Sequence, residues 1–375
     1  MRIYLDYAAT TPLDADVEVL MRPYQFLLGN ASSLHREGSA AKEALEEARE
    51  RLAAVLGAAS QELVFTSGGT EANNQVLLAA SGGHIITTAV EHSAILAPLR
   101  ALEVIGKISS TVLMPDSFGL VSAAQVRAAI TPATQLISVQ HVNNELGTIQ
   151  PIAEIAVVAK EYGIAFHVDA VQSLGHVPLL VSDLGCDLLS ISAHKFYGPK
   201  GVGALWVSKA LERRGFNLVP LLYGGQQERG LRGGTHDLPA IVGMGLAAEK
   251  AAMLQQSETR RLEPMRDWFA AQLTAFNDVS LNSNSSQRSP RHINITAHGA
   301  DGEALLMNLD LEGVAASSGS ACSSGTLEPS HVLSAIGKSK ADAKASLRFS
   351  LGRATRYTDL ELAVVAFGKA LNRSR

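Results

Sequence analysis

Apolar residues along this chain alternate between helical spacing and short continuous runs. Residues 41–56 place apolar side chains at helical spacing, with Gly57 as a stop signal, and residues 152–161 form a second helix-like stretch. Short apolar runs typical of buried strands occupy residues 62–65, 135–142, 165–168, 188–191 and 203–207. This alternation predicts βαβ units, and therefore an α/β fold built on a mainly parallel sheet.

The C-terminal part has a different pattern. A polar run at residues 282–289 predicts a loop, and the strand-like residues 292–295 follow it. We expect a large domain of residues 16–249. A smaller α+β domain would combine residues 1–15 with residues 250–375.

Composition narrows the class of protein. The chain has 375 residues, of which 46% are hydrophobic and 18% charged, as in an ordinary globular enzyme. A formal charge of −4 argues against broad nucleic-acid binding. Two cysteines indicate a reducing compartment, and neither a signal-peptide core nor a membrane-spanning run is present in the sequence. We therefore expect a cytoplasmic protein without a membrane partner.

A glycine-rich turn at residues 66–73 follows a predicted strand and opens a helix-compatible stretch. Its glycines let the backbone approach an anion, free amides at the helix start point towards that anion, and Thr70 adds a hydroxyl donor. The alternative is an ordinary turn in which Thr70 is the helix N-cap. Taken alone, this turn supports both interpretations equally.

Two strand ends carry further candidate chemistry. Asp169 ends an apolar strand, where open α/β sheets place ligands, although it could also be a helix N-cap. Lys195 closely follows another apolar strand, and burial there would free its amine for Schiff-base chemistry. Lys200, in the next turn, is more typical of a solvated lysine. An anion-binding turn, a carboxylate and a lysine are together what pyridoxal phosphate requires.

Cys322 lies among small residues, where a thiol is accessible to a substrate or a partner, and is therefore a candidate nucleophile. Cys186, in the stretch Leu-Gly-Cys-Asp-Leu at 184–188, is predicted to be a small core residue. The histidines show no convincing zinc-site spacing with either cysteine.

From Tyr4 to Arg353 the chain resembles the cysteine desulfurases of the IscS/NifS type, in the class V aminotransferase family. The motifs that carry the resemblance are Thr-Ser-Gly-Gly-Thr-Glu at 66–71, Glu-His at 91–92, Asn-Asn-Glu-Leu-Gly at 143–147, His-Val-Asp-Ala-x-Gln at 167–172, Ser-x-His-Lys at 192–195 and Ser-Ser-Gly-Ser-Ala-Cys at 317–322. The resemblance implies fold type I of the pyridoxal phosphate enzymes, with a seven-stranded sheet flanked by helices. The cysteine loop would belong to the smaller domain.

The resemblance also implies catalytic roles. Lys195 would bind the cofactor aldehyde covalently, Asp169 would pair with the ring nitrogen, and Gln172 would contact the ring oxygen. His92 would stack on the ring and assist proton transfer. Cys322 would attack the sulfur of free L-cysteine, giving alanine and a persulfide that passes to an acceptor protein.

Binding residues follow from the same resemblance. The phosphate would be held by Gly69, Thr70, Ser192 and His194. Thr235 would reach the phosphate of the neighbouring subunit, which implies a homodimer. Asn144 would contact cofactor and substrate, and with Arg348 it would bind the substrate carboxylate. No resident metal is implied, and Cys322 could be a transient ligand of an iron–sulfur cluster.

Several alternatives stay open at this point. A selenocysteine lyase or an aminotransferase could use the same fold, although the Cys322 loop argues against a plain aminotransferase. A sulfur-delivery scaffold with little turnover of its own is a different class of answer. The sequence stops at Arg375, soon after a helix-like stretch at residues 359–371, whereas housekeeping desulfurases generally run further and use that tail to dock an iron–sulfur scaffold. Iron–sulfur assembly, tRNA thiolation and DNA phosphorothioation are therefore all candidate pathways.

Overall fold

The computed structural model describes residues 2–283, 287–318 and 329–375. Its largest element is a seven-stranded sheet in which one strand, β8 (Gly203–Val207), runs antiparallel to both neighbours while the other strands share one direction. In spatial order the strands are β2 (Leu63–Thr66), β8 (Gly203–Val207), β7 (Leu188–Ser192), β6 (Ala165–Asp169), β5 (Thr134–Gln140), β3 (His84–Thr88) and β4 (Ser109–Leu113). The predicted α/β fold with a mainly parallel sheet is confirmed.

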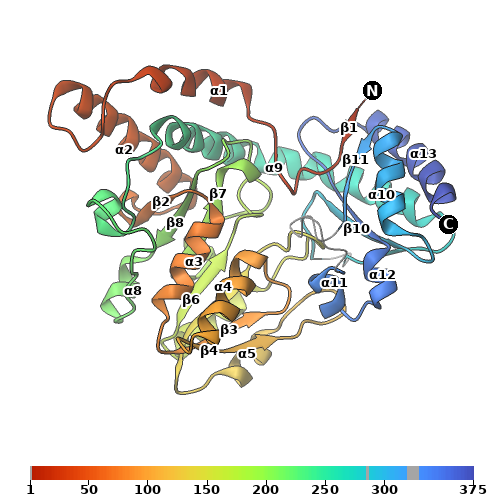
Figure 1. The fold of residues 1–375 in the computed structure, drawn as a ribbon, viewed down its shortest axis with the longest axis horizontal. Coiled ribbons are helices and arrows are strands. Elements are labelled where there is room, and N and C mark those ends of the chain that lie inside the picture. The colour runs from red at the N-terminus through yellow and green to blue at the C-terminus, as the bar shows by residue number, and fades with distance from the viewer. Residues whose placement is uncertain (1, 284–286, 319–328) are drawn as a thin grey trace.

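Helices cover both faces of this sheet (Figure 1). Successive strand residues point to opposite faces. Leu63 and Phe65 therefore pack in a core with α2 (Arg36–Leu56), whereas Val64 packs in another core with α3 (Gly69–Ala79) and α4 (Ser93–Val104). Burial on both sides explains why the strands read as continuous apolar runs. The α-helices of this part of the chain are α1 (Ala15–Met21), α2 (Arg36–Leu56), α3 (Gly69–Ala79), α4 (Ser93–Val104), α5 (Ala123–Ala129), α6 (Ile152–Glu161), α7 (Val181–Leu184) and α8 (Lys209–Arg213).

Most predicted elements are present, with shifted ends. α6 has the predicted bounds, and α2 ends as predicted at Gly57, whose φ of 67° is a left-handed cap that suits glycine. α2 begins earlier than predicted because the side chain of His35 caps it. Glu62 belongs to a 3₁₀ turn instead of strand β2, and the strand predicted over residues 135–142 ends at Gln140.

A second, antiparallel sheet lies on the right of Figure 1, close to both chain termini. Its order is β12 (Ser317–Ser318), β13 (Ser346–Ser350), β10 (His292–Ala297) and β9 (Val279–Leu281). Beside it, β1 (Ile3–Tyr4) pairs in parallel with β11 (Val314–Ala315). The helices of this region are α10 (Gly302–Leu311), α11 (His331–Ala335), α12 (Lys340–Lys344) and α13 (Tyr357–Arg373).

One long helix, α9 (Leu238–Thr274), joins the two regions (Figure 1). Its residues 238–251 pack in the core with α2, and its residues 262–273 pack in the core of the second sheet. The boundary predicted near residue 250 therefore falls inside a continuous helix, and the division into domains stays a prediction.

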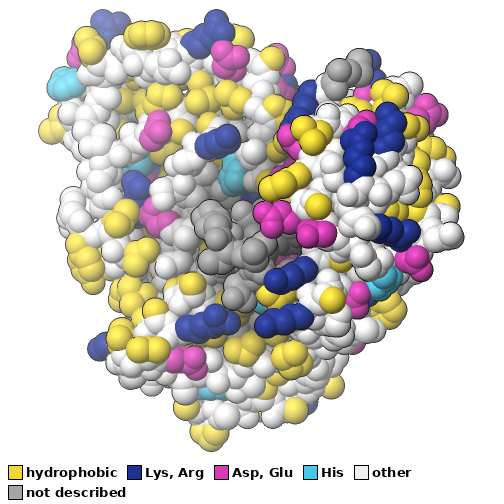
Figure 2. Space-filling view, turned by 45° about the vertical axis from the view of Figure 1, so that its right-hand side comes forward, with side chains coloured by type: hydrophobic (Ala, Val, Ile, Leu, Met, Phe, Trp, Pro, Cys, Tyr) yellow, Lys and Arg dark blue, Asp and Glu magenta, His cyan; other side chains and the backbone are white. Residues whose placement is uncertain are grey.

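The surface mixes charges of both signs. Figure 2 shows lysine and arginine side chains interspersed with acidic and apolar side chains on the face that it draws. Among the described residues, no helix is both long enough and apolar enough to cross a membrane.

Candidate active site

A cavity of about 750 Å³ opens beyond the carboxyl ends of several strands of the large sheet. This is the edge at which open α/β sheets place ligands, because the loops that follow the strands converge there. The predicted site residues that line it are Gly69, Thr70, His92, Asn144, Asp169, Gln172, Ser192, His194, Lys195 and Arg348. Thr235 does not line it, and Cys322 lies outside the described residues.

The glycine-rich turn forms the start of α3. Gly68 is the N-cap, with a φ of 153°, and Thr70 lies inside the helix. The alternative in which Thr70 is the N-cap is therefore wrong. A Cβ atom on Gly203 of β8 would lie 2.6 Å from the Cα of Gly68, so only a residue without a side chain lets β8 approach the turn. The amides at this helix start and the side chain of Ser192 border the cavity.

Asp169 is the last residue of β6, and its side chain is almost fully buried. One carboxylate oxygen accepts a hydrogen bond of 2.7 Å from the amide of Asn73 in α3, and the other accepts one of 3.0 Å from the backbone N–H of Val171. These two bonds fix the carboxylate at the cavity wall. Sequence analysis missed Asn73, because its contact with Asp169 spans 96 residues.

Lys195 ends the 3₁₀ turn Ala193–Lys195 that directly follows β7. Its Nζ donates hydrogen bonds of 2.8 Å to the backbone carbonyls of Ala8 and Ala9. The chain's N-terminal segment therefore holds the amine at the cavity. Lys200 lines the same cavity but is exposed, as predicted for a solvated lysine.

His92 precedes α4 and caps it, since its Nδ1 accepts a hydrogen bond from the N–H of Ala94. Burial lowers the pKa of His92, which favours the neutral ring. Its neighbour Glu91 is fully buried, and burial raises the pKa of that carboxyl to about 8. His194, which also lines the cavity, bonds to Thr10, and burial together with the charge of Lys195 lowers the pKa of His194 to about 4.

Arg348 reaches the cavity from β13 of the second sheet. Its guanidinium donates to the carbonyl of Asn144 at 2.9 Å and to the carboxylate of Asp6 at 2.7 Å. Nearby, Glu145 accepts a hydrogen bond from Ser330, and burial raises the pKa of Glu145 to about 7. The cavity is thus bounded by side chains from both sheets.

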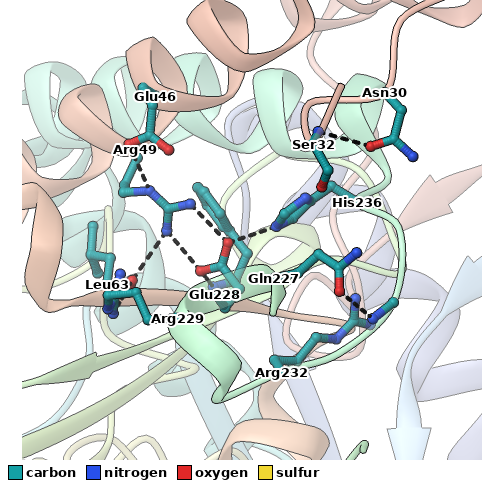
Figure 3. Close-up of polar contacts among 12 residues, drawn as sticks. Asn30, Ser32, Glu46, Arg49, Leu63, Gln227, Glu228, Arg229, Arg232 and His236 are labelled. Atoms are coloured by element: carbon teal, nitrogen blue, oxygen red, sulfur yellow. Dashed lines mark hydrogen bonds and ion pairs between the residues drawn. The ribbon is translucent and has the colours of Figure 1, made fainter. Parts of the chain in front are cut away.

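Thr235 is exposed on a loop that begins with the 3₁₀ turn Gln227–Gly230 and ends before α9. Figure 3 shows how this loop is held. Glu228, whose side chain is 0% exposed, forms a bidentate ion pair with Arg49 and a hydrogen bond with His236. Glu228 and Arg229 both have positive φ, a conformation that costs free energy in residues other than glycine.

The same loop is bonded to strand β2 and helix α3. Glu228 accepts from the backbone N–H of Phe65 in β2, and the guanidinium of Arg229 donates to the carbonyl of Leu63. Arg232 forms an ion pair with Glu71 in the first turn of α3. The loop that carries Thr235 is therefore fixed to both the strand and the helix that flank the glycine-rich turn.

These residues fit pyridoxal phosphate. A helix start with free amides suits a phosphate, a buried carboxylate suits a protonated ring nitrogen, and a lysine amine suits an aldehyde. All three open into one cavity.

Comparison with known proteins agrees with this chemistry. The pattern of the family named aminotransferase class-V matches residues 3–362. The chain belongs to this family. A cysteine desulfurase IscS from Dictyoglomus turgidum is 47% identical over the whole chain and 95% of its own length. Within the family, the chain is accordingly an enzyme of the cysteine desulfurase type, a group that depends on pyridoxal phosphate.

Solved structures show the same fold. A NifS-like protein superposes with a TM-score of 0.91 at 31% identity, covering 99% of this chain and 100% of its own. A protein named SspA, solved in complex with cysteine, is 40% identical with a TM-score of 0.80, covering 94% of this chain and 99% of its own. The expected type I fold is confirmed by these matches.

Cys186 is buried in the core, as predicted, and burial raises the pKa of its thiol to about 12. The thiol of Cys186 is therefore protonated at neutral pH and unreactive.

Proposed function

We propose that this enzyme removes sulfur from L-cysteine at the described cavity, with Lys195 as the cofactor lysine and Cys322 as the sulfur acceptor. The observation that supports this proposal most strongly is the shared opening of Lys195, Asp169 and the glycine-rich turn into one cavity. When bound, pyridoxal phosphate withdraws electrons from the α-carbon of the amino acid.

The substrate carboxylate would lie against Arg348 and Asn144. A guanidinium matches a carboxylate with two parallel hydrogen bonds, and the Nε of Arg348 has no hydrogen-bond partner among the described residues. Asp6 already accepts a hydrogen bond from Nη2 of this guanidinium, which reduces the side-chain entropy lost when a substrate binds.

Proton transfer would involve Lys195 and His92. Burial favours the neutral imidazole of His92, and because its Nδ1 accepts from the N–H of Ala94, the ring proton lies on Nε2. Lys195 would therefore take the proton from the substrate α-carbon, and His92 would assist as a hydrogen-bond donor. The thiolate of Cys322 would take the sulfur atom as the carbon–sulfur bond breaks. L-cysteine and the Cys322 thiol then give L-alanine and a persulfide, with no external oxidant or reductant.

The proposed working form is a homodimer in the cytoplasm. Thr235 is exposed and lies outside the cavity of its own chain, which fits a residue that serves the phosphate of a second copy. The persulfide would pass to an acceptor protein. Trapping that acceptor from the native host as a mixed disulfide with Cys322 would separate iron–sulfur assembly, tRNA thiolation and DNA phosphorothioation.

Replacing Cys322 with Ser tests the assignment. The variant should keep its yellow cofactor because Cys322 is not proposed to bind it. Release of sulfide and alanine from L-cysteine should fall by more than a hundredfold, an effect on the order of losing a catalytic nucleophile. Cys186→Ser is the matched control and should keep its activity. Desulfuration at the wild-type rate in the Cys322 variant would refute the assignment.

A further inference from the structure

Arg291, immediately before β10, is a fully buried arginine without a carboxylate partner among the described residues. Its side chain is 0% exposed, and one nitrogen, Nη2, donates a hydrogen bond of 2.5 Å to Oε1 of Gln172. Neither Nε nor Nη1 has a hydrogen-bond partner in the described structure. A buried cation without a counter-charge and with unbonded N–H groups destabilises a fold. Packing alone therefore does not explain why Arg291 is buried here.

Other buried arginines of this chain are paired. Arg49 has Glu228, Arg266 has Asp267 and Arg348 has Asp6, each within ion-pair distance. The charged groups that act on Arg291 include Arg348, and burial is the main reason that its pKa falls to about 10. The guanidinium therefore keeps its charge at neutral pH.

The titratable groups around Arg291 do not neutralise this charge at neutral pH. Tyr197 is a phenol whose pKa is raised by burial, and burial lowers the pKa values of His176 and His292 well below the usual range. All three side chains are therefore uncharged at neutral pH.

Gln172 connects this charge to the cavity. Its Nε2 donates a hydrogen bond of 2.9 Å to the carbonyl of Ala8, which also accepts from Nζ of Lys195. A guanidinium can only donate, so Arg291 requires the amide oxygen of Gln172 to face it. The amide nitrogen must then face the cavity side as a donor. Arg291 and the carbonyl of Ala8 thus together fix an amide orientation that Gln172 alone leaves free.

We propose that Arg291 is a positioning residue that holds Gln172 as a donor towards the ring oxygen of pyridoxal phosphate and favours the anionic form of that oxygen. This inference rests on the proposed function. It explains why the charge is unpaired among the described residues: its counter-charge arrives with the cofactor.

Arg291→Met tests the proposal in the full-length protein. Cofactor-free protein is titrated with pyridoxal phosphate, and the absorbance of the bound cofactor is followed against pH. We expect the dissociation constant to rise about tenfold, as for loss of a charge-assisted hydrogen bond. Loss of a nearby positive charge makes protonation easier, so the midpoint of the absorbance titration should rise by about one pH unit.

Thermal unfolding of the cofactor-free protein supplies a second readout. Here the substitution should not be harmful, although it weakens cofactor binding. Replacing a buried, unpaired charge by an apolar side chain of similar length should leave Tm unchanged or raise it. A residue that only supports the fold would lower Tm instead. Arg291→Lys keeps the charge, and its absorbance midpoint should stay close to that of the wild type.

Arg266→Met is the matched control. Arg266 is buried, pairs with Asp267 and bonds to the carbonyl of Ser289, two residues before Arg291. This variant should lower Tm without shifting the absorbance midpoint. An unchanged affinity and midpoint in Arg291→Met, or failure of that variant to fold, would overturn the proposal. If the wild type itself bound no pyridoxal phosphate, the proposed function would fail instead.

Discussion

Arg49 and Arg291 are both buried, but their guanidinium groups have opposite surroundings. Arg49 donates two hydrogen bonds to Glu228, a third to the carbonyl of Leu63 and a fourth to Glu46. Within the described part of the chain, Arg291 has a single hydrogen bond, to an uncharged amide. The first guanidinium is satisfied by the fold, whereas the second is not.

This difference distinguishes an arginine that stabilises the structure around the site from one whose charge acts on a bound ligand. The Arg49–Glu228 pair fixes the loop that carries Thr235 to strand β2, and both charges are compensated within the protein. The charge of Arg291 is compensated only when an anion occupies the cavity. A buried charge that is paired therefore indicates a structural role, and one that is unpaired beside a cavity indicates a ligand.

Arg49→Met should have the largest effect on stability. It leaves Glu228 buried without its cation, and breaking a buried pair from one side costs about 3–5 kcal/mol. Urea unfolding of the cofactor-free protein measures this loss. Glu46→Gln, which removes the half-exposed partner of the same guanidinium, should cost less than about 1 kcal/mol.

If Arg49→Met and Arg291→Met destabilised the cofactor-free protein equally, the proposed contrast between the two arginines would be wrong. The affinity for pyridoxal phosphate supplies a second test of this contrast. Arg291→Met should weaken binding of the cofactor more than Glu46→Gln does.

The pH dependence of stability tests the Arg49–Glu228 ion pair through a smaller expected effect. Burial alone would raise the pKa of Glu228, but hydrogen bonds from Arg49 and His236 outweigh it and lower the pKa to about 2. A lowered carboxyl pKa stabilises the fold above the unfolded value of about 4.3, and that stability is lost as the pH falls towards 2. Tm measured between pH 5 and pH 3 should fall, and Glu228→Gln should show a shallower fall. Parallel slopes for the two proteins would contradict the ion pair.

Local pattern was enough to predict much of the fold. The helix at residues 152–161 has the predicted bounds, because its apolar spacing and its environment agree. Asp169 and Lys195 lie at strand ends as predicted, since strand ends in a parallel sheet converge on one edge.

Contacts between residues far apart in the chain could not be predicted from the sequence. Asn73 meets Asp169, and Arg291 meets Gln172, across 96 and 119 residues, and no spacing rule connects such positions. The N-cap alternative for Thr70 failed because the N-cap is Gly68, two residues earlier, and the helix starts at Gly69. The roles assigned to the site residues remain proposals, and Cys322 lies outside the described residues.

The most direct test of the central claim is to find which lysine binds the cofactor. The holoenzyme is reduced with borohydride, digested and mapped by mass spectrometry. The account predicts a pyridoxyl group on Lys195, held at the cavity by the carbonyls of Ala8 and Ala9, and none on Lys200. A pyridoxyl group on Lys200 or on any other lysine, with Lys195 unmodified, would contradict it.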